Sequence, residues 1–470
     1  MRYRIITVLV AAVCLVGCAV GPNYQRPAAQ VPQSFRAPEP LPATQAASFA
    51  DLKWWQVFQD QDLQQLVKTA LVQNYDLRDA VARVEEARAN LGITRSNQFP
   101  QVSASGDIQF TRLSRNGQFP LPPDFVASQN RTWGEAFLNL LSFEVDLWGR
   151  LRRATEEARA NLLNAEENRK AVVTTLVSDV ATQYFTLREL DSELEISQET
   201  LGTRRESLEL TQARLSGGVA TRLDLRQSEQ LVYTAAENIP SLQQQIEQTE
   251  NQITLLLGKN PGEVIRSRGI DEHAVAPEVP AGLPSALLER RPDIRAAEEN
   301  LIAANAQIGV AKAEYFPRLS LSGTLGGQSP QLSSLFSGPS SAWSFVPQLT
   351  QPIFTAGRLR SNVRLAQAQR DSALVQYQKT IQTAFTEVSN ALIAHQRVRE
   401  SRVQQEALVG ALEDRKRLAY VRYRGGVDTQ LNALDADRDL YTAELALRQL
   451  KLNELLSVVQ LYKALGGGWQ

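Results

Sequence analysis

Two long stretches of this chain, residues 150–215 and 358–423, lack the residues that end helices. Each contains no proline and a single glycine. At 1.5 Å per residue, an uninterrupted helix of about 65 residues would extend roughly 100 Å. Helices in globular domains are usually far shorter, so these stretches predict helical rods that need neighbours along their whole length.

The helix expected at the end of the chain indicates how such rods pack. Its main apolar stripe follows a 3/4 spacing through Leu431, Leu434, Tyr441, Leu445, Leu452, Leu455, Val459 and Tyr462, interrupted by Arg438 and Arg448. A weaker second stripe runs through Leu440, Ala443, Leu447 and Leu450. One stripe would suit a hairpin, whereas two suit a helix packed on both sides, as in a ring of coiled coils.

The chain also repeats itself. At a shift of 293 − 76 = 217, the matching segments are 76–80 with 293–297 and the Phe-Pro pairs 99–100 with 316–317. At a shift of 357 − 149 = 208, they are 149–151 with 357–359 and the Gly-Gly-Val turns 217–219 with 425–427. Each half therefore reads helix, two strands, long helix, Gly-Gly turn, helix, which is an internal two-fold repeat.

The four predicted strands alternate apolar and polar residues, except the fourth, which is irregular and contains Pro347 and Pro352. We expect them at 102–110, 141–147, 319–325 and 343–354. Strands of about ten residues with this alternation are typical of a transmembrane barrel, with apolar residues outward and polar residues toward the lumen. A soluble antiparallel sheet with one wet face gives the same pattern.

Four strands are too few to close a barrel. An open edge in lipid leaves backbone groups unpaired, at several kcal/mol each. If the strands span a membrane, several copies must therefore share one barrel. Two copies give a barrel that side chains roughly fill, whereas three give a twelve-stranded barrel with a lumen. A conduit thus requires at least three copies.

The N-terminus predicts export and a lipid anchor. Arg2 and Arg4 precede an apolar run, 5–16, that is too short to span a bilayer and reads as a signal peptide. The run ends in Leu15-Val16-Gly17-Cys18, which resembles the bacterial lipobox and implies a lipidated Cys18. Ala19, in place of aspartate, favours sorting to the outer membrane by analogy with bacterial lipoproteins.

We therefore divide the chain into a signal peptide, an anchored extended arm, a first repeat, a linker and a second repeat. The expected ranges are 1–17, 18–60, 61–265, 266–284 and 285–470. Cys14 and Cys18 are the only cysteines. Removal of the signal peptide leaves one thiol at the new terminus, which excludes a disulfide within the mature chain.

Composition excludes several function classes. The formal net charge is −1 and the charged residues are interspersed, so no basic face favours nucleic acid. The two histidines, His273 and His395, lie far apart with no third partner. No His/Cys cluster suits zinc and no glycine-rich loop suits phosphate. We therefore expect no enzyme activity, no cofactor and no metal site.

Taken together, these features resemble the TolC-like outer-membrane efflux proteins, and more closely the NodT-type lipoproteins that serve as ducts for tripartite RND pumps. The resemblance rests on residues 18–24 and 26–27, the segment Glu289-Arg290-Arg291-Pro292-Asp293-Ile294, the paired Phe-Pro strand starts and the Gly-Gly-Val turns. The resemblance covers essentially the whole mature chain.

The resemblance implies an α+β membrane protein and a function. The fold would be a homotrimer in the Gram-negative outer membrane, with four strands per protomer in a shared twelve-stranded barrel continued by a periplasmic α-helical barrel. The protein would be a passive exit channel for drugs and toxic compounds, docked to a periplasmic membrane-fusion adaptor and an inner-membrane RND pump. A type I secretion duct, a non-conducting lipid-anchored scaffold and a cell-wall lipoprotein enzyme are the alternatives.

The two Gly-Gly turns are the main candidate sites. Their residues are Arg214, Leu215, Gly217, Gly218 and Val219 in the first half, and Tyr423, Arg424, Gly425, Gly426 and Val427 in the second. The resemblance implies that adaptor hairpins dock here and that the channel narrows here. The simpler interpretation is that each Gly-Gly ends a helix, with Thr221 and Thr429 capping the next.

Three further residues are candidates for a gate or a helix break. Asp428 stands where the first half has Ala220. On a threefold axis it would form a carboxylate ring that attracts cations or tightens a gate, or it simply caps a helix. Asp435 is a second gate candidate and also suits a solvated helix face. Pro240 is expected to break the second helix of the first half, where the second half has Arg448.

Overall fold

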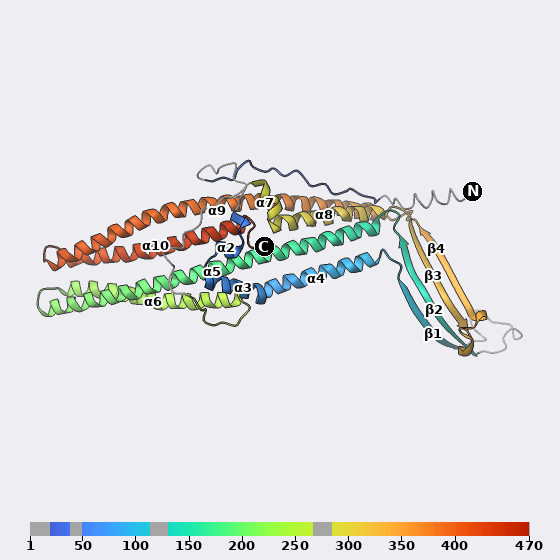
Figure 1. Cartoon of the computed structure of the whole chain (residues 1–470), viewed down its shortest axis with the longest axis horizontal. Helices are drawn as coiled ribbons and strands as arrows, with labels where there is room; N and C mark the ends of the chain where they lie inside the picture. Colours follow the sequence, from blue (N-terminus) through green and yellow to red (C-terminus); the bar gives the residue numbers. More distant parts are fainter. Residues whose placement is uncertain (1–18, 38–48, 113–129, 267–283, 470) are drawn as a thin grey trace. The chain divides into compact units, whose positions relative to one another are not determined.

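The computed structural model describes residues 19–37, 49–112, 130–266 and 284–469. The elements of the first half are the 3-10 turn Phe49–Asp51, α2 (Trp54–Val57), α3 (Gln61–Gln73), α4 (Tyr75–Ser96), β1 (Val102–Arg112), β2 (Asn130–Val145), α5 (Arg150–Ser216) and α6 (Arg222–Leu256) (Figure 1). Those of the second half are α7 (Pro284–Arg290), α8 (Pro292–Ala313), β3 (Arg318–Ser329), the 3-10 turns Leu332–Ser334 and Gly338–Ser340, β4 (Ser341–Thr350), α9 (Arg358–Arg424) and α10 (Gln430–Ala464).

The long helices form where helix-ending residues are absent. α5 and α9 are each single helices of 67 residues, as predicted. Each is followed after a short turn by a helix of 35 residues, α6 or α10. The order helix, strand, strand, helix, helix therefore occurs in both halves of the chain.

The four strands form one antiparallel sheet in the order β1-β2-β3-β4. β2 begins at Asn130, well before the predicted start at 141, and its register shifts between Leu140 and Phe143. This shift moves the apolar residues from one parity of the sequence numbering to the other. The part of the strand before the shift therefore did not fit the alternation that predicted 141–147. β4 spans Ser341–Thr350, so Pro352 lies outside it, and Pro347 is tolerated because β4 is an edge strand.

The described residues group into two compact units. The first takes in the described parts of 1–27, 84–165 and 297–377, and the second those of 28–83, 166–296 and 378–470. The unit boundaries fall within α4, α5, α8 and α9. In the first unit Ile308 and Ala311 of α8 pack with Ala366 of α9.

The second unit has an aromatic core at the end of α10. The ring of Tyr462 meets Phe49 and Phe58 edge-on, at centroid distances of 5.6 and 6.0 Å. Both predicted stripes of α10 contain buried residues, among them Tyr441 and Leu452 in one and Leu440 in the other. α10 is therefore packed on two sides, as its sequence indicated.

One expectation about the helices was wrong. α6 runs from Arg222 to Leu256 through Pro240 without a break. The Pro240 side chain is exposed, and on the solvent side of a helix a freed carbonyl can bond to water. The arm expected to be extended over 18–60 contains the 3-10 turn Phe49–Asp51 and α2. Among the described residues, no helix combines the length and apolar character needed to cross a membrane.

Candidate functional site

The two Gly-Gly turns have the same backbone geometry. In the first, the amide of Gly218 donates to Leu215 O at 3.0 Å and that of Val219 donates to Arg214 O at 2.9 Å. This is the Schellman arrangement, which requires a left-handed residue after the helix. Gly218 supplies it with a φ of +75°. In the second turn Gly426 supplies it with a φ of +73°.

Each turn leads into a capped helix, as predicted. The hydroxyl of Thr221 accepts from the amide of Asp224, and that of Thr429 accepts from the amide of Asn432. Each turn exposes an apolar side chain between its Gly-Gly pair and the capping threonine. Val219 is 76% exposed and Val427 is 68% exposed. Exposed apolar groups at the end of a helical hairpin offer a surface for another protein.

The structure brings two of the predicted turn residues together. The guanidinium of Arg214 lies over the ring of Tyr423, 4.6 Å from its centroid. Arg214 lies in the last turn of α5 and Tyr423 in the last turn of α9, so this cation–π contact joins the two hairpins. Such a contact contributes about 0.5–1 kcal/mol at an exposed site.

Asp428 is held by its own hairpin. Its carboxylate accepts from Arg422 Nε at 3.0 Å, Asn432 Nδ2 at 2.6 Å and the Thr429 amide at 2.8 Å. These donors, with Arg422 the largest contributor, keep the pKa of Asp428 below its ordinary value. Asp435 forms an exposed ion pair with Arg438 at 3.1 Å. Both carboxylates therefore have partners within one protomer.

A buried ion-pair cluster nearby was not predicted from the sequence. Asp437 of α10 is 2% exposed and accepts from Arg204 Nε of α5 at 2.8 Å and Lys416 Nζ of α9 at 2.7 Å. Arg204 also donates to Leu231 O of α6 at 3.1 Å. The cluster thus connects all four helices of the two hairpins.

Polar contacts on either side extend this cluster. Gln430 donates to the hydroxyls of Thr211 and Ser228, each at 2.8 Å. The Tyr441 hydroxyl accepts from Asn238 at 2.9 Å and bonds to Ser197 at 2.9 Å. Buried polar groups need such partners because an unsatisfied one is costly. One signal was visible in the sequence: Asp437 lies three residues after Leu434 and four before Tyr441, on the apolar stripe.

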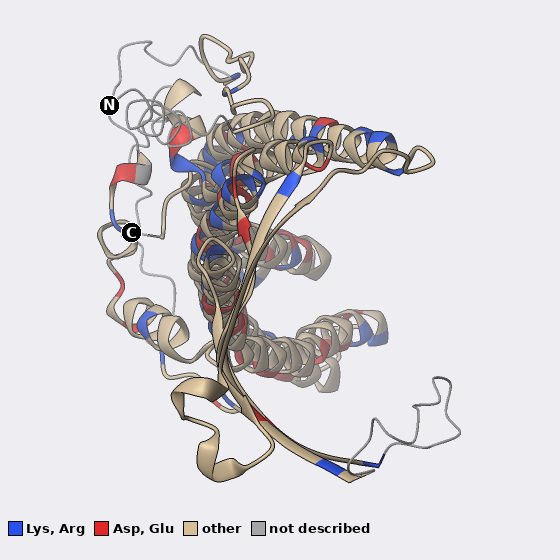
Figure 2. Ribbon diagram, turned by 90° about the vertical axis from the view of Figure 1, so that its right-hand side faces the viewer, with Lys and Arg blue, Asp and Glu red and all other residues tan. Residues whose placement is uncertain are grey.

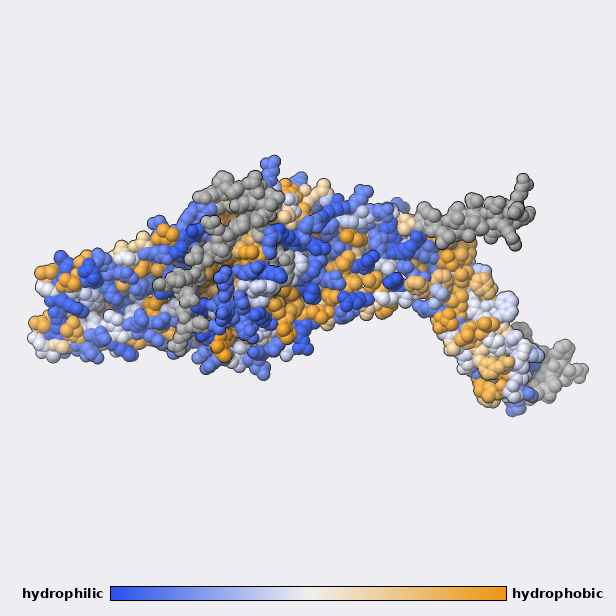
Figure 3. All heavy atoms as spheres, in the orientation of Figure 1, coloured by the Kyte–Doolittle hydropathy of each residue, from blue (hydrophilic) through white to orange (hydrophobic). Residues whose placement is uncertain are grey.

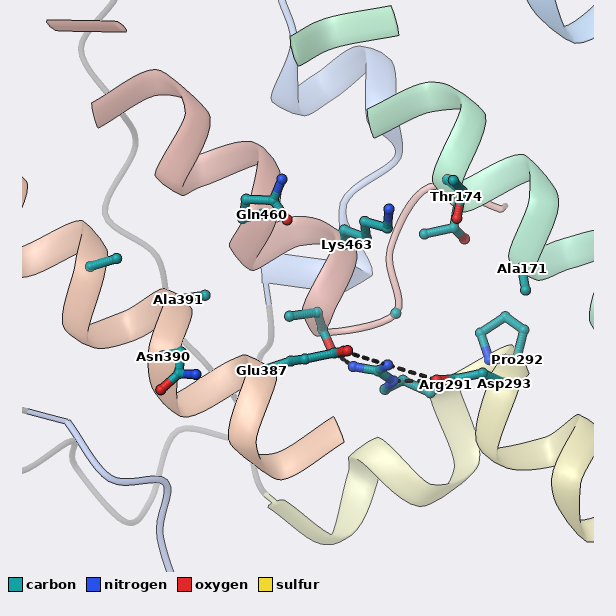
Figure 4. Close-up of a pocket in the computed structure, with 14 residues that line it drawn as sticks. Ala171, Thr174, Arg291, Pro292, Asp293, Glu387, Asn390, Ala391, Gln460 and Lys463 are labelled. Carbon is teal, nitrogen blue, oxygen red and sulfur yellow. Dashed lines mark hydrogen bonds and ion pairs between the residues drawn. The ribbon is translucent and has the colours of Figure 1, made fainter. Parts of the chain in front are cut away.

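The last three residues of the Glu-Arg-Arg-Pro-Asp segment, Arg291, Pro292 and Asp293, line a cavity of about 600 Å³ in the second unit. Arg291 points across it to Glu387 of α9 at 2.7 Å and to Asp293 at 2.7 Å (Figure 4). Its guanidinium also donates to the carbonyl of Ala464, at the end of α10. Arg291 therefore fastens α9 and the end of α10 to the start of α8, which is a structural role.

The arm after the predicted anchor is fixed in the first unit. Arg153 of α5 donates to Val20 O at 3.3 Å and to Asn23 Oδ1 at 2.7 Å. Asn305 of α8 donates to Pro22 O at 2.9 Å, and Tyr24 donates to Glu298 at 3.0 Å. Cys18 itself lies outside the described residues, so its lipidation stays a prediction.

The two faces of the sheet differ in polarity. On one face the strand register aligns Ser103, Asn139, Thr324 and Ser344 across all four strands. The other face exposes Ile108, Phe110, Leu138, Leu325, Trp343, Phe345 and Leu349. Hydrophobic side chains gather over the strands in Figure 3. An exposed apolar face of this extent indicates contact with lipid or protein.

No chemistry-bearing cluster accompanies these features in the part of the chain that the structure describes. Among these residues, no three His, Cys, Asp or Glu side chains are placed to hold a metal ion. His395 bonds through Nδ1 to the Ser457 hydroxyl at 2.8 Å. His273 lies outside the described residues.

Comparison with known proteins matches this chain over nearly its full length. A family model described as outer membrane efflux protein matches residues 66–259 and 283–467. The antibiotic efflux pump outer membrane protein ArpC of Pseudomonas putida is 40% identical over 476 residues, covering 100% of this chain and 96% of that protein. The cation efflux system protein CusC of Escherichia coli is 35% identical over 460 residues, covering 98% of this chain and 97% of that protein.

Solved structures of membrane proteins are similar to this chain over nearly its whole length. The open state of the MtrE outer membrane channel of Neisseria gonorrhoeae has a TM-score of 0.86 at 31% identity, covering 96% of this chain and 99% of that chain. A membrane protein from Pseudomonas aeruginosa has a TM-score of 0.86 at 35% identity, covering 96% of this chain and 100% of that chain.

Proposed function

The chain belongs to the outer membrane efflux protein family, and on that premise we propose that three copies share one twelve-stranded barrel as the exit channel of a tripartite pump. The protein is an outer-membrane efflux component that extends into the periplasm, and its family is one of channels, not of enzymes. As a passive duct it lets cargo leave and supplies no energy of its own.

The observation that carries the proposal is the open, two-faced sheet. Among the described residues β1 and β4 are the unpaired edges of the sheet, and one face exposes apolar side chains along all four strands. In lipid such edges must pair, because unpaired backbone groups there cost several kcal/mol each. Pairing β4 of one copy with β1 of the next satisfies both edges, and three copies leave a lumen lined by the polar face.

The two Gly-Gly turns are the proposed contact sites for partner proteins. We assign adaptor docking to residues 214–219 and 423–427, whose exposed Val219 and Val427 suit an apolar contact with hairpins of a periplasmic membrane-fusion adaptor. An inner-membrane RND pump would provide the driving force. No observation favours a type I secretion duct or a non-conducting scaffold.

The gate proposal concerns Asp428 and, second, Asp435. Near a threefold axis the Asp428 carboxylates of three copies would form a ring, and their low pKa keeps them charged at neutral pH. Asp428→Ala should make the resting channel leakier to large antibiotics in a strain without the pump. Asn432→Ala, which removes a partner of Asp428 and keeps the charge, is the control. Unchanged permeability in Asp428→Ala would leave Asp428 with a capping role only.

The anchor proposal concerns Cys18. A lipid there would lie close to the fixed segment that begins at Ala19, whose neighbour Val20 donates to Trp148 O at 2.9 Å just past the end of β2. Cys18→Ser should abolish incorporation of labelled palmitate. Retained label in that variant would exclude Cys18 as the lipidated residue.

The cargo is proposed to be small molecules such as drugs and toxic compounds. Relatives carry names that specify antibiotics, toluene and cations, so a similar duct serves chemically different cargo.

Reconstitution in planar bilayers tests the channel function directly. The purified protein should give stable single-channel conductance, and expression of the chain in a strain lacking its own exit duct should restore resistance to a pump substrate. Trimers that insert but conduct no ions, together with no gain in resistance, would contradict the proposal.

A further inference from the structure

The loop between β3 and β4, residues 330–340, folds back over the apolar face of the sheet. A Cβ atom on Gly327 would collide with the carbonyl oxygen of Leu335, and one on Gly134 would lie 3.8 Å from a methyl group of Leu332. The strand register puts both glycines on the face that carries Ile108. The chain needs glycine at 327 because any side chain there would displace the loop.

Several polar groups of this loop are hydrogen-bonded within it. The Ser334 hydroxyl bonds to that of Ser329 at 2.7 Å and to Gln331 O at 3.1 Å. The Ser337 hydroxyl donates to Ser334 O at 2.7 Å, and Leu335 is buried beneath, 6% exposed. A segment in contact with hydrocarbon must bond internally in this way, because no water is present to do so.

The loop is uncharged and exposes two large apolar side chains beside the polar Gln331, Ser333 and Ser337. Phe336 is 86% exposed and Leu332 68%. No charged residue occurs between Arg318 and Arg358, so β3 after its first residue, the loop and β4 are uncharged. Two large apolar side chains exposed together beside the apolar face of the sheet indicate a partner.

The position of the loop selects the partner. Gly134 and Gly327 belong to β2 and β3, the central strands, whereas another copy of the chain would pair at β1 or β4. Figure 2 shows the sheet curved along its strands, with this loop on the convex side. On a closed barrel the convex side faces lipid.

We propose that the β3–β4 loop is a lipid-binding element, with Phe336 and Leu332 inserted among acyl chains at the outer boundary of the membrane. The inference rests on the proposed barrel, in which the apolar face of the sheet meets lipid. The loop covers part of that face near the strand ends, and its aromatic ring suits the interface. This hairpin would hold the barrel at a fixed depth.

Site-directed spin labelling tests the proposal. Cys14 and Cys18 are the only cysteines, both at the N-terminus, so a cysteine at 336 can be labelled with little background. Full-length Phe336→Cys, carrying a nitroxide and reconstituted in liposomes, is compared with Phe345→Cys on the apolar face and Ser105→Cys on the polar face. Collision with oxygen reports lipid, and collision with a water-soluble nickel chelate reports water. Leu332→Cys is the second probe site if the first variant assembles poorly.

The proposal expects the oxygen-to-nickel collision ratio at 336 to match that at 345 and to exceed that at 105 several-fold. A label at 336 exposed to nickel while 345 is in lipid would overturn the loop proposal and leave the channel intact. A label at 336 shielded from both reagents would also overturn it, since the loop would then contact protein. A label at 345 exposed to nickel would contradict the proposed barrel itself.

Discussion

One buried carboxylate, Asp437, connects the helices of both hairpins. It pairs with Arg204 and Lys416, and Arg204 also lies over the ring of Tyr441 at 4.9 Å from its centroid. Removing one partner of a buried ion pair leaves the other charge without a counter-charge in a site with little water. This usually destabilises the fold more than replacing both partners by apolar residues. Asp437 is therefore the single residue on which the contact between the hairpins depends most.

Asp437→Ala should lower the stability of the helical region by about 3–5 kcal/mol, because Arg204 then remains buried without its carboxylate. Thermal unfolding followed by circular dichroism measures the loss. Asp439→Ala is the matched control: Asp439 pairs with Arg415 at 2.8 Å on the surface, and such pairs contribute about 0–1 kcal/mol. Equal melting of the two variants would refute the role given to Asp437.

Glu189 of α5 is a second buried carboxyl group. It is 2% exposed, and its Oε1 has no hydrogen-bond partner. Burial, reinforced by the neighbouring Glu193 carboxyl, raises the pKa of Glu189 from 4.5 to about 8. The folded state therefore holds a proton that the unfolded chain releases above pH 4.5, so the stability from this group falls as pH rises toward 8.

Glu189→Gln should flatten that dependence, since the amide needs no proton to stay neutral. The variant should match the wild type near pH 5 and melt at a higher temperature at pH 8. Glu206→Gln, at an exposed position of the same helix, should leave the pH profile unchanged. If Glu189→Gln melts at the same temperature as the wild type at pH 8, Glu189 is not protonated in the fold.

At the scale of elements, the sequence predicted helices better than strands. The limits of α5 and α9 follow from the glycines and prolines outside them, which are local signals. The start of β2 depends on the register shift at Leu140 and Phe143, and that shift is decided by pairing with β3, far along the chain. Asp437 was missed for a related reason: its partners lie on α5 and α9, which no local pattern of α10 reveals.

The Gly-Gly turns give the element-scale prediction. Gly426 has a φ of +73°, where any residue with a Cβ loses about 1–2 kcal/mol. Gly426→Ala should therefore loosen the end of α9 and increase tryptic cleavage at Arg422 and Arg424. In Gly425→Ala the added Cβ would lie 3.4 Å from Val421 O, and Gly425 has no positive φ. Cleavage equal in both variants would mean that the left-handed glycine does not hold the turn.

At the scale of the whole molecule, a single chain leaves its surface incomplete. The sheet has two unpaired edges and an apolar face exposed along its strands. Helices α5 and α9 likewise expose apolar side chains along their length, among them Leu163, Leu365 and Val375. Both features are satisfied together if identical copies close into a ring, which is why the oligomeric state is the central claim.

The protein mass of the particle extracted in mild detergent, with detergent mass subtracted by light scattering, tests that claim most directly. A particle of three chains is the predicted result, because three copies are the fewest that close a barrel with a lumen. A stable particle of one or two chains would contradict the account, since its four or eight strands could not enclose a conducting pore.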